Sequence, residues 1–127
     1  MKKTTARRRT KSSSAPHPKI DLAAARAFAA RHLPGVAVAE KFGNASFSVA
    51  GKVFAFTRPD GLVLKLPPES LARLYATREA APLVMGKRTM REWAHLHLPS
   101  GEEYREELPL LRESMIFVSI IRSMRLE

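Results

Sequence analysis

The pattern of apolar and polar positions predicts a helix at each end of the globular part of the chain and short strands between them. The first helix begins after Asp21, a residue type that caps helix N-termini, and Pro34 and Gly35 end it. We expect one face of this helix to pack against the domain. Helical spacing gives that face Leu22, Ala25, Phe28, Ala29 and Leu33.

Four short segments that follow are rich in residues that favour strands. They cover residues 36–40, 45–50, 52–57 and 62–66. Ala50 and Gly51 predict a tight hairpin turn, and the run from Arg58 to Gly61 places Pro and Gly where turns prefer them. The order predicts an antiparallel meander. In its last strand, leucines alternate with Val63 and Lys65, which predicts one buried and one wetter face.

A second helix should open at Pro67 and Pro68, because proline is tolerated in a first helical turn. The loop expected after it carries Pro82, Gly86, Lys87, Arg88 and Arg91. The next predicted strand alternates, so that one face of it holds Trp93, His95 and His97. A last helix should begin near Pro109. About half of its circumference or more is apolar. The apolar positions are Leu110, Leu111, Met115, Ile116, Phe117, Val118, Ile120, Ile121 and Met124.

Strands flanked in sequence by helices predict an α+β fold, in which helices pack on one side of an antiparallel sheet. We expect this domain to span residues 20–127. Residues 1–19 contain no large apolar side chain except Met1, and serines and prolines interrupt them. They are therefore expected to form a disordered basic tail.

The net charge of +10 comes mostly from this tail. The chain has 22 Lys and Arg against 12 Asp and Glu, and no acidic residue precedes Ile20. A basic tail of this kind attracts phosphates without reading sequence. The tail positions expected to contact nucleic acid are Lys2, Lys3, Arg7, Arg8, Arg9 and Lys11.

Composition disfavours several other classes of protein. With no cysteine, the chain can form no disulfide and no thiolate metal site. No apolar run approaches the ~20 residues that span a bilayer. The basic N-terminus is not followed by an apolar stretch and a small-residue cleavage site, so we do not expect a secretory signal. We therefore expect a cytoplasmic protein without a membrane partner. A transit peptide is an alternative interpretation of the Arg- and Ser-rich start.

No constellation of residues indicates catalysis or metal binding. The two aspartates, Asp21 and Asp60, are expected in a helix cap and in a turn, so a Ser-His-Asp triad has no orienting acid. His95 and His97 alone do not complete a tetrahedral metal site, and no carboxylate lies at a metal-binding spacing. The glycines are too dispersed for a nucleotide-binding loop. We expect no catalytic residue, no cofactor and no metal.

Two segments of the predicted meander resemble the signature of the bacterial MmcQ/YjbR family. They are Phe47–Ala55, FSVAGKVFA, and Leu62–Pro67, LVLKLP. Further matching positions are Leu33-Pro34-Gly35, Trp93, Leu111, Ser114 and Val118, so the likeness covers about residues 21–119. The resemblance implies a compact antiparallel sheet with helices on one side and DNA binding through a double-wing arrangement. The chain departs from the family pattern in its basic N-terminal extension and at Met115, where an aromatic residue is common.

Together these features predict a non-enzymatic DNA-binding module. The tail would supply non-specific affinity, and basic residues on turns and strands would orient the duplex, with RNA as an alternative ligand. Lys52 and Lys65 also match the family signature. The predicted contacts within the domain are Lys52, Arg58, Lys65, Lys87, Arg88, Arg91 and Trp93. Two alternatives stay open: a solvated basic surface without a ligand, and a protein-interaction or self-associating module that uses the sheet face and the apolar last helix.

Overall fold

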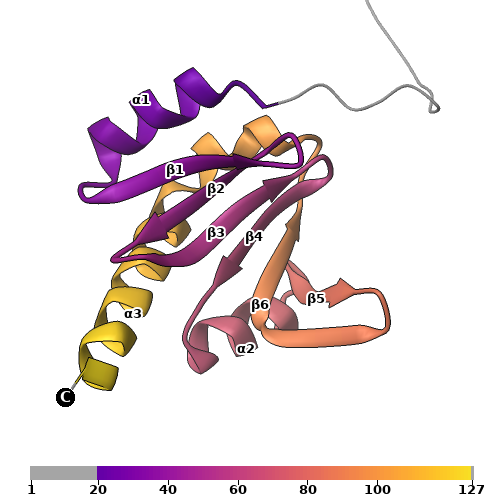
Figure 1. The fold of residues 1–127 in the computed structure, drawn as a ribbon. Helices are drawn as coiled ribbons and strands as arrows, with labels where there is room; N and C mark the ends of the chain where they lie inside the picture. The colour runs from indigo at the N-terminus through magenta and orange to yellow at the C-terminus, as the bar shows by residue number, and fades with distance from the viewer. Residues whose placement is uncertain (1–19, 127) are drawn as a thin grey trace, which may run out of the picture.

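The computed structural model describes residues 20–126, with side chains described as far as Ile121. The fold is α+β, with helices and one antiparallel sheet (Figure 1). Its elements, in chain order, are α1 (Leu22–His32), β1 (Val36–Lys41), β2 (Asn44–Val49), β3 (Lys52–Arg58), β4 (Gly61–Lys65), α2 (Pro68–Ala76), β5 (Ala81–Met85), β6 (Arg88–His97), the 3₁₀ helix η1 (Gly101–Glu107) and α3 (Leu108–Leu126). The predicted tail, with all of its proposed phosphate contacts, lies outside the described residues.

The sheet contains six strands in the order β1-β2-β3-β4-β6-β5, and all neighbouring pairs are antiparallel. The predicted meander is therefore confirmed from β1 to β4. Ala50 and Gly51 form the turn between β2 and β3, and both have positive φ, as a type I′ hairpin turn requires. Phe42 and Gly43 form a matching turn between β1 and β2, with φ of 52° and 83°.

The helices pack on one face of the sheet and enclose the main apolar core (Figure 1). The Asp21 carboxylate accepts a hydrogen bond from the Ala24 amide at 3.0 Å, which confirms the predicted cap of α1. Strands β2 to β4 and β6 contribute alternate residues to the core. The core includes Ala25, Leu33, Phe47, Phe54, Leu62, Leu64, Leu71, Leu74, Ala94, Leu96, Tyr104, Leu111 and Val118.

Helix α3 supplies one buried stripe and leaves further apolar residues outside. Leu111, Ser114 and Val118 are buried, whereas Ile116 and Ile120 are 54% and 53% exposed. The core thus covers only part of the broad apolar surface that the sequence predicts for α3. The predicted apolar position Met124 lies outside the described side chains. Within residues 20–126, no helix is long and apolar enough to cross a membrane.

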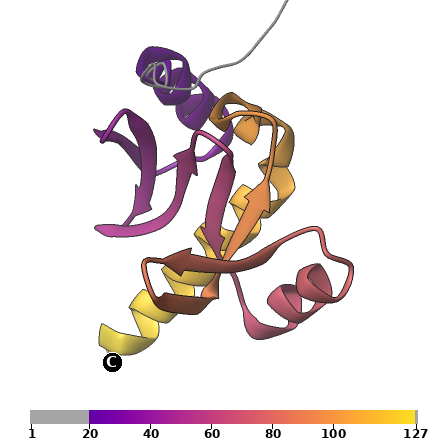
Figure 2. The same cartoon turned by 90° about the vertical axis from the view of Figure 1, so that its right-hand side faces the viewer.

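Strand β5 and the first part of β6 form a bent hairpin, residues 81–93, which we call the β5–β6 arm. Pro82 pairs with Ala94, but Leu83 pairs with Met90, so residues 91–93 have no partner on β5. The sheet bends at this irregularity, and Figure 2 shows the arm turned away from the direction of β4. The predicted loop across these residues is therefore wrong: a two-residue turn at Gly86 and Lys87 joins two strands.

The arm also changes the environment of the sheet face opposite the helices. Val63 lies on this face, opposite Phe56 and His95 on the neighbouring strands, yet it is fully buried. Leu83 of the arm is likewise almost fully buried and lies outside the helix-side core. The expectation of a wetter face is wrong for this part of the sheet, because Val63 is fully buried there.

Candidate functional site

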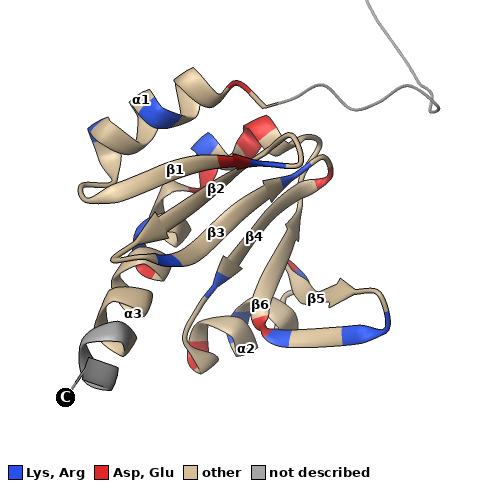
Figure 3. Ribbon diagram, in the orientation of Figure 1, with Lys and Arg blue, Asp and Glu red and all other residues tan. Residues whose placement is uncertain are grey.

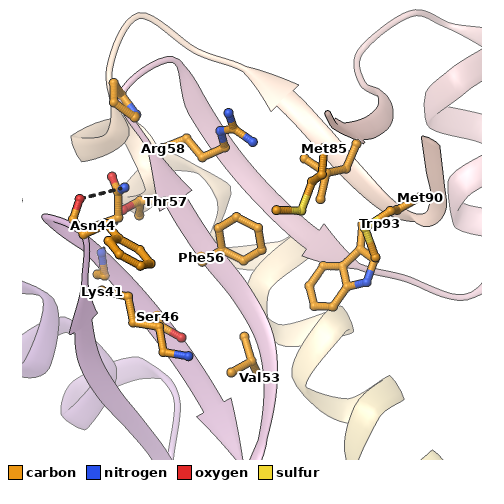
Figure 4. Close-up of a pocket in the computed structure, with 14 residues that line it drawn as sticks. Lys41, Asn44, Ser46, Val53, Phe56, Thr57, Arg58, Met85, Met90 and Trp93 are labelled. Atoms are coloured by element: carbon orange, nitrogen blue, oxygen red, sulfur yellow. Dashed lines mark hydrogen bonds between the residues drawn. The ribbon is translucent and has the colours of Figure 1, made fainter. Parts of the chain in front are cut away.

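A groove with a volume of about 580 Å³ lies on the sheet face opposite the helices, between strands β2 and β3 and the β5–β6 arm (Figure 4). We call it the arm groove. Apolar side chains dominate its lining, and polar side chains lie at one end. Apolar residues of the lining include Phe42, Val53, Phe56, Leu83, Met85, Met90 and Trp93. The polar ones include Lys41, Asn44, Ser46 and Arg58.

Two aromatic side chains of the groove lining pack against each other. The rings of Phe56 on β3 and Trp93 on β6 are 5.8 Å apart between centroids, at an angle of 50° (Figure 4). Lys65, the cross-strand partner of Trp93, places its Nζ 5.9 Å from the indole centroid and 3.8 Å from the Glu92 carboxylate. Lys65 therefore supports the indole ring and is partly neutralised by Glu92.

Two basic residues and one exposed aromatic residue stand at the polar end of the arm groove. Lys41 ends β1 and Arg58 ends β3, and both line the groove. Phe42 is 100% exposed and has a φ of 52°, a conformation that costs a residue other than Gly, Asn or Asp roughly 1–2 kcal/mol.

A second cluster of polar side chains lies beside Arg58. His95 and His97 stack with ring centroids 4.1 Å apart, and the His95 Nε2 lies 3.3 Å from the Asp60 Oδ1. Arg58 approaches the same carboxylate more loosely, with its Nε at 3.9 Å. Burial, with the nearby His97, lowers the pKa of His95, and the Asp60 carboxylate opposes this shift.

The predicted site residues fall into separate groups. Arg58 and Trp93 line the arm groove, and Lys65 lies beneath Trp93. Lys52 begins β3, whereas Arg58 ends it, so about 20 Å of strand separates them. The three basic residues of the β5–β6 arm are exposed along its outer part, and Figure 3 shows basic segments there. These three are Lys87, Arg88 and Arg91.

Sequence reasoning missed several residues of the groove. Lys41, Phe56, Met85 and Met90 carry no motif, because they meet only when the arm bends over the sheet. Phe42 did carry a signal: an aromatic residue directly before Gly43 occupies a hairpin turn, where Asn or Gly is usual. Met85 lines the groove and pairs with Arg88 across the arm, so both side chains lie on the side of the arm that faces the groove.

Comparisons with protein-family models, with curated proteins and with solved structures find no match to this chain. The resemblance to the MmcQ/YjbR family therefore stays a prediction from the residues quoted above. The functional argument rests on the geometry of the arm groove and the charges around it.

Proposed function

We propose that this chain is a non-enzymatic DNA-binding module that holds unpaired bases in the arm groove and phosphates at its basic end. The observation that carries this proposal is the combination of Phe42, Phe56 and Trp93 with Lys41 and Arg58 around one groove. Proteins that bind single strands combine aromatic side chains, on which bases stack, with basic side chains along the backbone.

The shape of the arm groove favours an unpaired strand over the duplex that the sequence alone suggests. Its volume of about 580 Å³ is within the range of pockets that enclose small organic groups such as bases. Paired bases within a duplex expose only their edges, so they cannot stack on Phe56 and Trp93.

The basic N-terminal segment adds affinity of a different kind. The six basic residues predicted to contact phosphates there neutralise them whatever the base sequence and whether the nucleic acid is single- or double-stranded. Lys87 and Arg88, at the tip of the arm, extend the basic path beyond the groove. The proposal thus assigns general affinity to the basic segment and preference for unpaired bases to the arm groove.

The test compares binding of a labelled single strand and a matching duplex to the full chain by fluorescence anisotropy. We expect tighter binding of the single strand and a change in emission of Trp93, the one tryptophan of the chain. The double variant Lys41→Gln/Arg58→Gln should lower the salt dependence of single-strand binding by about 1.4 in log-log slope, at roughly 0.7 per phosphate contact. An RNA strand of the same sequence serves as the comparison between DNA and RNA.

The matched control is Arg31→Gln/Arg73→Gln, which removes the same charge from exposed positions on α1 and α2. It should leave the salt slope unchanged. If both double variants lower the slope equally, or if the Trp93 emission stays constant on binding, the groove does not hold the strand. A preference for duplex would likewise contradict the proposal.

A second candidate function is self-association through α3. Ile116 and Ile120 lie one helical turn apart and are both more than half exposed. Exposed apolar side chains that gather on one helix face are typical of interfaces between proteins. Light scattering should then give a dimer at high concentration for the natural chain and a monomer for Ile116→Ser/Ile120→Ser. A monomer in both cases excludes this function.

A further inference from the structure

We propose that Asp60, His95 and His97 form a binding site for a divalent transition-metal ion. Their ligand atoms all lie within 4.8 Å of one another. Two residues apart on β6, the histidines project from the same face of the strand, and the turn between β3 and β4 brings Asp60 to them. A search for ligands by sequence spacing misses this site, because Asp60 comes from a different hairpin.

The environment of His95 indicates a missing partner. This residue is only 8% exposed, and its Nε2 atom is enclosed yet makes no hydrogen bond. The Asp60 Oδ1 lies 3.3 Å away, and it forms an ion pair with the imidazole only when His95 is protonated. A buried polar atom without a partner is costly, and a metal ion between the imidazole and the carboxylate would satisfy both.

The backbone holds the three residues in place without help from their side chains. The Asp60 carbonyl accepts a hydrogen bond from the Leu98 amide at 2.9 Å. Gly61 pairs with His97 and lies directly against the backbone of Leu96. Since the turn is fixed to β6 at two points, the ligands are gathered before an ion arrives, which lowers the entropic cost of binding.

The donor set selects the kind of ion. Two imidazole nitrogens and one carboxylate oxygen suit Zn²⁺ and its transition-metal neighbours, whereas Mg²⁺ and Ca²⁺ prefer oxygen ligands alone. Three protein ligands leave at least one coordination position for water or an anion. His97 and Asp60 are exposed, so an ion can enter from solvent. Arg58, at 3.9 Å, holds the carboxylate too loosely to block it.

The experiment uses the full chain prepared without a polyhistidine tag and titrated with Zn²⁺ and with Co²⁺. We expect one ion per chain, a rise in melting temperature with Zn²⁺, and a visible absorption band with Co²⁺. His97→Ala and Asp60→Asn alter exposed side chains and should fold normally. Each should weaken Zn²⁺ binding by at least about tenfold, since even loss of an outer-shell partner costs a metal site that much.

His32→Ala on α1 and His17→Ala near the N-terminus are the matched histidine controls, and both should bind Zn²⁺ as the natural chain does. Folding of each variant is checked by its melting temperature without metal. The proposal is overturned if the natural chain shows neither Zn²⁺ stabilisation nor a Co²⁺ band. It is also overturned if His97→Ala and Asp60→Asn retain full affinity, or if His17→Ala alone removes the binding.

Discussion

The α-carbon of Gly61 faces the backbone carbonyl of Leu96 so closely that a methyl group at position 61 would overlap the carbonyl oxygen. Gly61 begins β4, pairs with His97 and has a φ of +152°, a conformation that side chains disfavour. This contact fixes the turn between β3 and β4 against β6. It thereby positions Arg58 at the arm groove and Asp60 beside the histidines.

Gly61→Ala should therefore destabilise the protein strongly, by about 3 kcal/mol or more, because the new methyl group can only be accommodated by separating β4 from β6. Urea unfolding followed by circular dichroism measures the loss. Gly86→Ala is the matched control: its φ is also positive, at 62°, but a methyl group there meets nothing within 4 Å. That variant should lose only about 1 kcal/mol. Equal losses would show that the contact with Leu96 is unimportant.

Ser114 of α3 is buried and contacts backbone carbonyl groups of β3 and β4, at the ends of these strands far from the Gly61 turn. Its hydroxyl lies 3.0 Å from the Phe54 carbonyl and 2.5 Å from the Lys65 carbonyl, where β3 and β4 separate. The hydroxyl has one proton to donate, so Ser114→Ala removes the one donor that these two carbonyls share, and it should cost about 1–3 kcal/mol. Chemical unfolding measures this loss against Ser119→Ala, a change outside the fully buried stripe of α3. A loss no larger than that of the control would contradict the bridging role.

Much of the fold could be predicted because its signals are local. The cap at Asp21, the turn at Ala50 and Gly51, and the turn from Arg58 to Gly61 each depend on neighbouring residues. Strand β5 was missed, because Pro82 and the basic run at Lys87 and Arg88 resemble a loop. A proline is tolerated there because β5 lies at the edge of the sheet.

The candidate sites were less accessible to prediction, because they depend on long-range geometry. The arm groove exists only because the pairing shifts between Pro82 and Leu83 and bends the arm over Phe56. No local pattern encodes that bend. Similarly, the alternation in β6 predicted that His95 and His97 share a face, but only the pairing of Gly61 with His97 brings Asp60 to them. Sequence reasoning thus named Arg58, Lys65 and Trp93 as candidates without showing how they meet.

Glu107 makes the stability depend on pH. Partial burial raises the pKa of its carboxyl group, and the nearby Glu106 and Glu79 carboxylates add to the shift. The folded state therefore binds a proton at Glu107 more readily than the unfolded state does, so the contribution of this residue to stability falls as pH rises above about 4.5, its ordinary pKa. Compared with the Glu107→Gln variant, the natural chain should lose stability between pH 4 and pH 7. Parallel pH profiles in urea unfolding would contradict this assignment.

The two hairpin turns at Phe42-Gly43 and Ala50-Gly51 offer a matched test of function against stability. Phe42 and Ala50 share a φ of 52°, which asparagine adopts more easily than either residue. Both Phe42→Asn and Ala50→Asn should therefore stabilise the protein, by up to about 1 kcal/mol each. Only Phe42 lines the arm groove.

If bases stack on Phe42, Phe42→Asn should weaken single-strand binding by about 1–3 kcal/mol, the usual contribution of one aromatic platform. Ala50→Asn should leave the affinity unchanged, because its turn lies at the other end of β2 and β3. Thermal melting and anisotropy on the same samples separate the two effects. A more stable Phe42→Asn protein with weaker binding would mean that the strained aromatic residue serves the ligand. Unchanged binding by Phe42→Asn would remove this residue from the site and leave its strain without a functional explanation.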